Sequence, residues 1–178
     1  AHTSTAEIAE AAGVAEGSIF YHFGSKSKLL DSLGAVYAHE KVAAMARGET
    51  DLSKLEPGIM IERAFAYCEA HGMGEAQVGL DQDNPELQPF IEVNREIVVG
   101  FISKVMAASM PPESPAYADI EIAASLAYAA VTDALCHVFA RPDPLDRDAV
   151  LRETIRFVRA ACGYDAGTKA IQHEKPDG

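Results

Sequence analysis

Cys68 and His71 have the residue types and the i, i+3 spacing that could bind a metal ion from one helix. No second pair of ligands accompanies them, whereas a structural zinc site usually has four protein ligands. The run from Asp81 to Asn84 resembles the start of a calcium loop, but Glu86 stands where such a loop requires glycine. We therefore predict no metal and no other cofactor, and favour a packed thiol beside a pocket histidine.

Residues that could carry out catalysis form no motif. The sequence has no nucleophile–base motif, no glycine-rich phosphate loop and no paired-carboxylate arrangement. The pattern favours a binding protein over an enzyme. Scattered histidines and aspartates leave a helical enzyme with a central cavity as an alternative, and a helical adaptor that binds protein through apolar faces as a third.

The first 33 residues have the spacing of a nucleic-acid-binding motif. Ser4 and Glu7 fit the S-x-x-E pattern of a capping box, which predicts a helix from Thr5 to Ala12. Gly13 ends this helix with the positive φ that a tight turn often needs, and a second short helix is predicted from about Ala15 to His22. This is the outline of a helix-turn-helix, although an αα-corner in any small helical protein has the same spacing.

The residue types in this segment favour the helix-turn-helix. The string IAEAAGVAEGSIFYHFGSKSKLL closely resembles the DNA-binding signature of the tetracycline-repressor (TetR) family of bacterial transcriptional regulators. The matching positions are Ile8-Ala9, Ala12-Gly13-Val14, Gly17-Ser18-Ile19, Tyr21-His22-Phe23, Ser25-Lys26 and Leu29-Leu30. The resemblance covers only the N-terminal part of the chain.

The resemblance implies that a small set of residues contacts DNA, namely Ser4, Thr5, Gly17, Ser18, Tyr21, His22 and Lys26. Hydroxyls, helix-start N–H groups and lysine mostly contact phosphate, and only groups that reach base edges specify sequence. Two residues depart from the family pattern. Phe20 replaces a usual tyrosine, and Glu16 stands where lysine or a neutral polar residue is common, so DNA affinity is more affected than the fold.

The rest of the chain is predicted to be helical. The expected helices run from Ser25 or Lys26 to Arg47, Pro57 to His71, Pro85 or Pro89 to Ser109, Tyr117 to Ala140, and Asp146 to Cys162. The resemblance implies an all-α fold with a helix-turn-helix DNA-binding domain (1–33, first helix missing), a helical ligand-binding and dimerisation domain (34–163) and a flexible tail (164–178). Gly34 is interpreted as a tolerated surface glycine, although it could permit a bend.

A small-molecule effector site is expected because, in the family, the helices of the second domain surround a cavity. The candidate residues are Phe65, Cys68, His71, Phe90, Asn94, Phe101, Tyr128 and Thr132. Apolar and aromatic surface with a few polar groups is typical of such a site, which predicts an apolar or aromatic effector. Asn94 interrupts an apolar stripe, so it is either a core amide bonded to the backbone or a ligand contact.

The segment Tyr117–Ala140 is apolar nearly all round, which predicts cover on several sides. The resemblance implies that this helix and Asp146–Cys162 pair with those of a second subunit in a four-helix bundle. The implied partners are a second copy of the chain, double-stranded operator DNA and the effector. A membrane span is not predicted, because the segment carries Glu121, Asp133 and His137.

Composition favours a globular cytoplasmic protein. Hydrophobic residues make up 48% of the chain, and its three cysteines form no C-x-x-C pair, which suits a reducing compartment. The net charge of −12 contrasts with the basic surface that phosphate contacts require. The chain begins without Met and in mid-motif, so we interpret it as N-terminally incomplete, without a preceding helix that is often rich in Arg and Lys in the family.

Overall fold

A computed structural model describes residues 3–71 and 84–164 of the chain. Within these ranges it is helical and contains no strand, which confirms the all-α prediction. The α-helices are α1 (Thr5–Ala12), α2 (Glu16–Phe23), α3 (Lys26–Ala46), α4 (Pro57–His71), α5 (Gln88–Ser109), α6 (Ile120–Phe139) and α7 (Arg147–Ala161). Short 3₁₀ helices, η1 (Leu52–Lys54) and η3 (Pro115–Asp119), precede α4 and α6. Most of the rejected calcium loop and the predicted tail from residue 165 lie outside the described residues.

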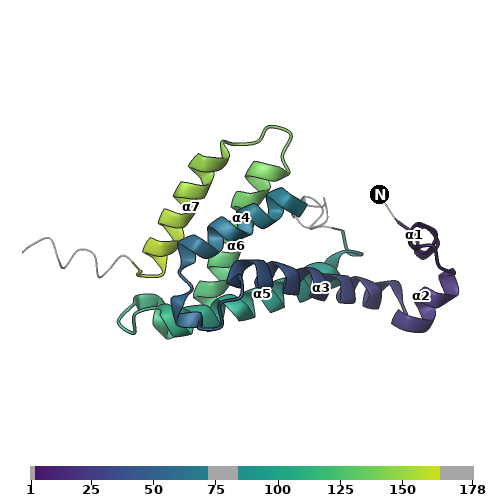
Figure 1. Cartoon of the computed structure of the whole chain (residues 1–178), viewed down its shortest axis with the longest axis horizontal. Coiled ribbons are helices and arrows are strands. Elements are labelled where there is room, and N and C mark those ends of the chain that lie inside the picture. Colours follow the sequence, from purple (N-terminus) through teal and green to yellow (C-terminus); the bar gives the residue numbers. More distant parts are fainter. Residues whose placement is uncertain (1–2, 72–83, 165–178) are drawn as a thin grey trace, which may run out of the picture.

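The two shortest α-helices, α1 and α2, form a small unit at one end of the molecule (Figure 1). Ser4 caps α1 in a complete capping box with Glu7, as predicted. Gly13 ends α1 at φ 67°, a left-handed conformation that favours glycine. A separate small core holds this unit to α3, and it consists of Ala9, Ile19 and Leu29 with Ile8 and Phe23 packed against them.

Helices α3 and α5 lie side by side along the length of the molecule and run in the same direction (Figure 1). Gly34 of α3 is buried, and a Cβ at this position would lie 2.5 Å from the carbonyl oxygen of Phe90 in α5. The interpretation of Gly34 as a surface glycine is therefore wrong. Any side chain here would meet the backbone of the neighbouring helix, so the close crossing of the two helices requires glycine.

The C-terminal end of α3 is fixed by α4. The Arg63 guanidinium of α4 donates hydrogen bonds to the carbonyl oxygens of Met45 and Ala46, at 2.8 and 3.1 Å. These carbonyls have no partner within their own helix, because the last turn of an α-helix leaves its C=O groups unpaired. Arg47 then turns the chain at φ 50°, and Gly48 follows at φ 79°. The guanidinium thus joins the end of α3 to the body of the protein.

The main core lies between α4, α5, α6 and α7, and its buried members include Ile61, Phe65, Cys68, Met106, Ala124, Leu135, Val158 and Cys162. Two ion pairs hold α7 to the α4 region, Arg147 with Glu69 at 3.2 Å and Arg159 with Glu56. Tyr164, which the sequence assigns to the start of the flexible tail, packs on this core. Its hydroxyl lies 2.7 Å from that of Ser109.

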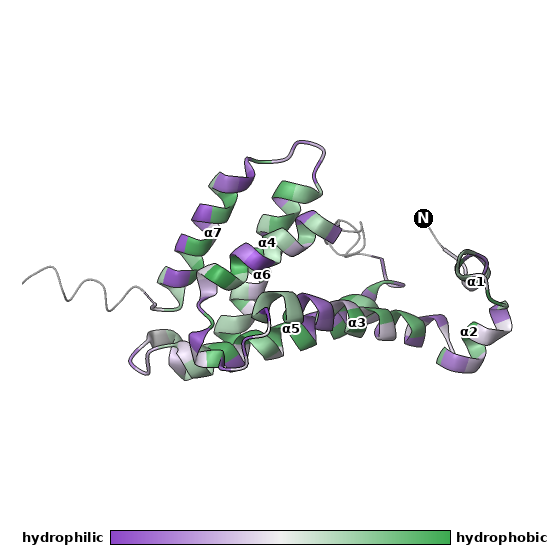
Figure 2. Cartoon of the chain, viewed as in Figure 1, coloured by the Kyte–Doolittle hydropathy of each residue, from purple (hydrophilic) through white to green (hydrophobic). Residues whose placement is uncertain are grey.

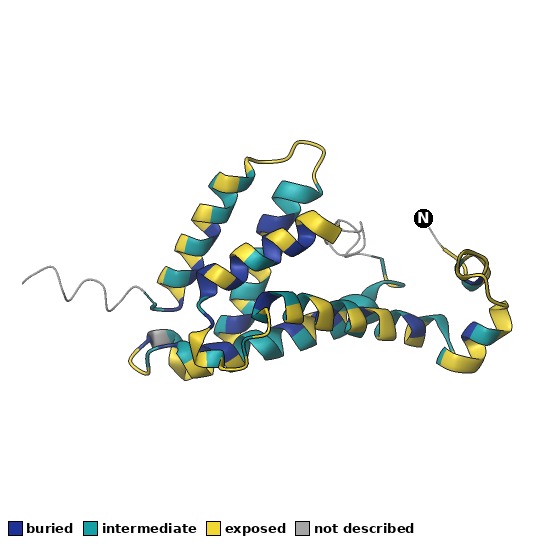
Figure 3. Cartoon of the chain, viewed as in Figure 1, coloured by how far each residue is buried: buried dark blue, intermediate teal, exposed yellow. Residues whose placement is uncertain are grey.

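Helix α6 is largely apolar in Figure 2 and mostly of intermediate burial in Figure 3, and large apolar side chains of α6 and α7 are exposed. Ile122, Leu126 and Phe157 are 61%, 66% and 59% exposed. The stretch Ala116–Phe139 has a mean hydropathy of 1.5 and is long and apolar enough to cross a membrane by length and composition alone. A single helix of this kind is weak evidence for a membrane span, because core helices of soluble proteins have the same length and composition.

Candidate DNA-binding helices and effector cavity

Helix α2 buries Ile19 in the small core with α1 and α3, and most of its other residues are exposed. Tyr21 is 85% exposed, and its ring meets the exposed His22 edge-on with centroids 5.2 Å apart. Gly17 in the first turn is exposed, and a Cβ there would touch nothing within 4 Å. Ser18 is half-buried on the same helix. An exposed short helix with an open N-terminal turn can approach another surface closely.

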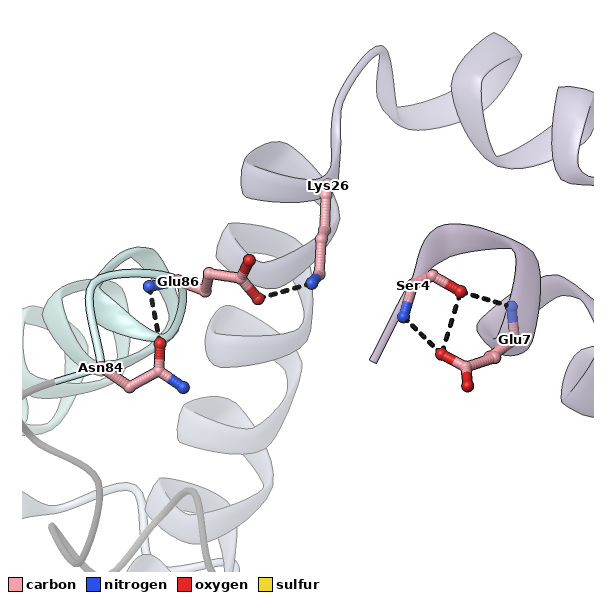
Figure 4. Close-up of polar contacts among 5 residues, drawn as sticks. All are labelled: Ser4, Glu7, Lys26, Asn84 and Glu86. Atoms are coloured by element: carbon pink, nitrogen blue, oxygen red, sulfur yellow. Dashed lines mark hydrogen bonds and ion pairs between the residues drawn. The ribbon is translucent and has the colours of Figure 1, made fainter. Parts of the chain in front are cut away.

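The start of α1 carries two hydroxyls that are already engaged. Ser4 Oγ accepts a hydrogen bond from the Glu7 N–H at 3.2 Å, and Glu7 Oε2 accepts from the Ser4 N–H at 2.7 Å (Figure 4). These bonds to Ser4 hold the pKa of the Glu7 carboxyl below its usual range. Thr5 Oγ1 donates to Glu16 Oε1 of α2 at 2.6 Å. Glu16, which departs from the family pattern, therefore ties α1 to α2.

Lys26, at the start of α3, forms an ion pair with a residue from a distant part of the sequence. Its Nζ lies 2.7 Å from Oε2 of Glu86, which precedes α5 (Figure 4). Asn84 Oδ1 accepts a hydrogen bond from the Glu86 N–H at 3.0 Å, which fixes the local backbone. Of the seven predicted DNA contacts, Lys26 is the one that bonds to the body of the protein within residues 3–71 and 84–164. Its ammonium must leave Glu86, or share it, to contact a phosphate.

A narrow apolar cavity lies at the other end of α3, between α3, α4, α5, α6 and α7. About 60 Å³ of it is wide enough to hold the centre of a water molecule. Its apolar walls include Met45, Met60, Ile61, Ala64, Val98, Ile102, Met106, Val131, Leu135 and Val158. Its lining also includes four residues with polar side chains, Lys41, Tyr128, Thr132 and Tyr164. A small space with this lining suits a small apolar molecule with one polar end.

Of the eight predicted effector residues, only Tyr128 and Thr132 line this cavity. Burial raises the pKa of the Tyr128 phenol, while a side-chain hydrogen bond with Thr132 lowers it. Phe65 and Cys68 are buried in the main core. Phe101 packs between two smaller clusters, and the Phe90 ring lies 6.2 Å from that of Tyr37.

His71 and Cys68 point to different environments, although both belong to α4. His71 is exposed, stacks on the Tyr67 ring at 4.3 Å, and its Nδ1 lies 2.9 Å from the Tyr67 carbonyl oxygen. Cys68 is 1% exposed. Among the residues that the structure describes, no three histidine, cysteine or acidic side chains are grouped to hold a metal ion. Burial raises the pKa of the Cys68 thiol, so it is a neutral core group.

Asn94 is buried in α5, one turn before Val98, and does not line the cavity. Only 5% of its surface is exposed, and its Nδ2 has no hydrogen-bond partner within residues 3–71 and 84–164. An unpaired buried amide is costly, so its interpretation as a core amide bonded to the backbone is not supported. Its role as a ligand contact stays a prediction.

Lys41 is the residue that sequence reasoning missed. It lines the cavity from α3, and its Nζ lies over the Tyr37 ring, 5.0 Å from the centroid. Burial lowers the pKa of this ammonium, and the nearby Cys68 opposes that effect. The sequence held a signal: Lys41 lies four residues from both Tyr37 and Met45, so a charge falls on the inner face of the helix.

The comparison with known families places the first part of the chain. Residues 1–33 match the family model described as bacterial regulatory proteins of the tetR family. The match covers α1, α2 and the first turns of α3. No curated protein sequence matches the chain significantly.

Proposed function

We propose that this tetR-family transcriptional regulator, so identified by its N-terminal DNA-binding region, is a dimeric repressor released from a palindromic operator by a small apolar molecule. The observation that carries the proposal is the continuity of α3. This single helix begins with Lys26 beside the DNA-binding helices and lines the cavity with Lys41 and Met45 near its other end. A molecule in the cavity therefore contacts the same rigid element that carries the DNA-binding unit.

On the DNA side, α2 is proposed to enter the major groove. Tyr21 and His22 have the exposure needed to reach bases, and Gly17 leaves room for the backbone to approach phosphate. Ser18 would contact DNA from the same helix. Ser4 and Thr5 would contribute from the start of α1, where their hydroxyls now bond to Glu7 and Glu16.

The DNA-binding region is acidic, so each of its few lysines, including Lys26, matters for phosphate contact. Residues 1–34 contain two lysines against four carboxylates, so few cations are available to neutralise phosphate. Lys26 is half-buried and bonded to Glu86 in the structure. We propose that DNA phosphate competes with Glu86 for this ammonium. A conformation that holds Lys26 and Glu86 together would then bind DNA less tightly.

A second copy of the chain is the proposed occupant of the exposed α6–α7 face. A two-fold interface brings the same patch of both subunits together, so an apolar face can cover itself. Leu126, Ile122 and Phe157 provide large apolar side chains, and the many alanines of α6 allow close approach of helices. Two recognition helices held in this way would read a palindrome, because DNA half-sites repeat with the symmetry of the dimer.

The cavity is the proposed effector site, with Tyr128 and Thr132 as polar contacts retained from the sequence prediction. A ligand weakens DNA binding only as far as it prefers the conformation that does not bind DNA. Coupling of this kind is typically about 1–3 kcal/mol, or 5- to 150-fold in affinity. Location in the cytoplasm follows from the proposal, since that is where the bacterial chromosome lies.

The test is fluorescence anisotropy with labelled duplexes that tile the DNA beside the protein's own gene, using the protein expressed from the whole gene. We expect one duplex to bind with a stoichiometry of two chains, and unlabelled random duplex to compete poorly. Binding that is equal for all duplexes at every salt concentration would contradict operator recognition. The assay measures DNA binding and not turnover of a substrate. An enzymatic role would therefore not produce sequence-specific binding in it.

A further inference from the structure

Lys41 gives the cavity a charge that its apolar walls do not balance. It is the only cation among the described residues that line the cavity, and no lining residue is a carboxylate. The ion pairs within the described residues involve Lys26, Lys54, His137 and several arginines, but not Lys41. Its ammonium lies over the aromatic face of Tyr37, a weak substitute for a full negative charge.

A purely structural lysine would be expected to extend its ammonium into water, since its long stem can cover apolar surface while the charge stays solvated. Lys41 instead is half-buried, and burial lowers the pKa of its ammonium. Most of the desolvation of this cation is therefore already present without a ligand. An arriving anion loses only its own hydration and gains a charged partner in a site with little competing water.

The remaining walls limit the shape of that anion. The walls offer apolar contact from Met60, Met106, Val98 and Leu135. The cavity volume is about 60 Å³, measured as the space open to the centre of a water molecule. A bulky molecule would clash with the walls. A multiply charged molecule would bury a charge that has no partner there. A slender apolar chain with a single carboxylate at one end would match both: the chain would contact the apolar walls, and the carboxylate would pair with the Lys41 ammonium.

We propose that the effector is an apolar monocarboxylic acid whose carboxylate accepts hydrogen bonds from the Lys41 ammonium, with its chain among the apolar walls. The inference rests on the proposed function, because it names the ligand class of the proposed effector site. Tyr128 and Thr132, on α6, are further polar groups of the same cavity. An acid held between Lys41 and α6 would bridge the DNA-linked helix to the α6–α7 pair.

The experiment compares three probes of equal chain length by isothermal titration calorimetry with the full chain, namely octanoate, 1-octanol and octylamine. We expect octanoate to bind about tenfold more tightly than 1-octanol, and octylamine to bind most weakly, because charge-assisted hydrogen bonds are the strong ones. Lys41→Met should remove the preference for octanoate, and Lys41→Arg should keep it. Lys104→Met, which removes an exposed lysine of α5, is the matched control and should bind as the wild type does.

The outcomes separate this inference from the proposed function. Equal binding of octanoate and 1-octanol by the wild type, or an unchanged preference in Lys41→Met with a native melting curve, would overturn the assignment of Lys41 while leaving the cavity as a ligand site. Failure of all three probes to bind would also overturn it. Preferential octanoate binding without any effect on operator affinity would support the ligand class and contradict its role as effector.

Discussion

Lys26 and Glu86 are joined by an ion pair of 2.7 Å although 60 residues separate them in the sequence. Lys26 belongs to the segment that matches the tetR family, and Glu86 lies outside it, just before α5. The pair is partly exposed, so its own contribution to stability is small. Its importance lies in where it holds the ammonium, at the start of the helix that links the DNA-binding unit to the cavity.

Glu86→Gln is expected to raise operator affinity about two- to fivefold, because it removes a competitor for Lys26 worth at most about 1 kcal/mol. Glu92→Gln is the matched control, since it removes the same charge from an exposed position on α5. Anisotropy titrations of both variants against the wild type measure the effect. An equal gain in the two variants would mean that general charge repulsion, and not competition for Lys26, limits affinity.

Lys26→Ala is expected to weaken binding to operator and to random duplex alike, because a phosphate contact carries no sequence information. The slope of log affinity against log salt concentration should become shallower by about 1, the value for one lost phosphate contact. Titrations at several salt concentrations check this. An unchanged slope with reduced affinity would place Lys26 among the structural residues instead.

Gly34→Ala is expected to destabilise the protein by about 1–3 kcal/mol, the usual cost of overpacking, because its Cβ would meet the Phe90 carbonyl oxygen. Gly100→Ala, in α5, meets nothing within 4 Å and should be neutral or stabilising by up to about 1 kcal/mol through helix propensity. Urea unfolding of both variants provides the comparison. The reverse order of stability would mean that α3 and α5 separate readily at their crossing.

Leu126→Glu is expected to give monomers or aggregates, because the charge would be buried without a partner in the proposed two-fold interface. Val36→Glu places the same charge on an apolar residue of α3 that is 57% exposed, and should leave the assembly state unchanged. Sedimentation velocity at micromolar concentration measures both. A monomeric wild type would contradict the dimer directly.

Lys41→Met is expected to stabilise the protein without ligand at neutral pH. Burial lowers the folded-state pKa of Lys41 below its ordinary value of 10.5, so the unfolded chain binds this proton more tightly. Wild-type stability should therefore rise with pH between the lowered pKa and 10.5, whereas the variant lacks this dependence. The difference in melting temperature should be largest below the lowered pKa and shrink above it, with Lys104→Met as the control that shows none.

Local features of the fold were accessible from the sequence because they depend on neighbouring residues. The capping box of Ser4 and Glu7, the positive φ of Gly13 and the start of α4 at Pro57 follow from short-range hydrogen bonding and backbone sterics. Contacts between distant helices were not accessible in the same way. Periodicity identifies the inner face of α3, but not that Gly34 on this face meets Phe90.

The candidate cavity illustrates the same limit. The family resemblance points to helices that surround a cavity, and of the eight residues predicted on them Tyr128 and Thr132 line the cavity described above. Phe65 and Cys68 belong to α4, which lines the cavity, but both side chains are packed in the main core. Ile61 lies on the same face as Phe65 and does line the cavity, so helical spacing alone does not separate the two positions. Sequence alone gives little reason to place Lys41 in a cavity, because a lysine is usually solvated.

The crossing at Gly34 also limits how α3 can move. Lys41 lies roughly 10 Å along the helix axis on one side of Gly34, and Lys26 roughly 12 Å on the other, at 1.5 Å per residue. With the two backbones in contact at this point, a tilt of α3 would pivot there. A displacement at the cavity would then appear at the DNA-binding unit with similar amplitude and opposite direction, which would couple the two sites without any change in the length or curvature of the helix.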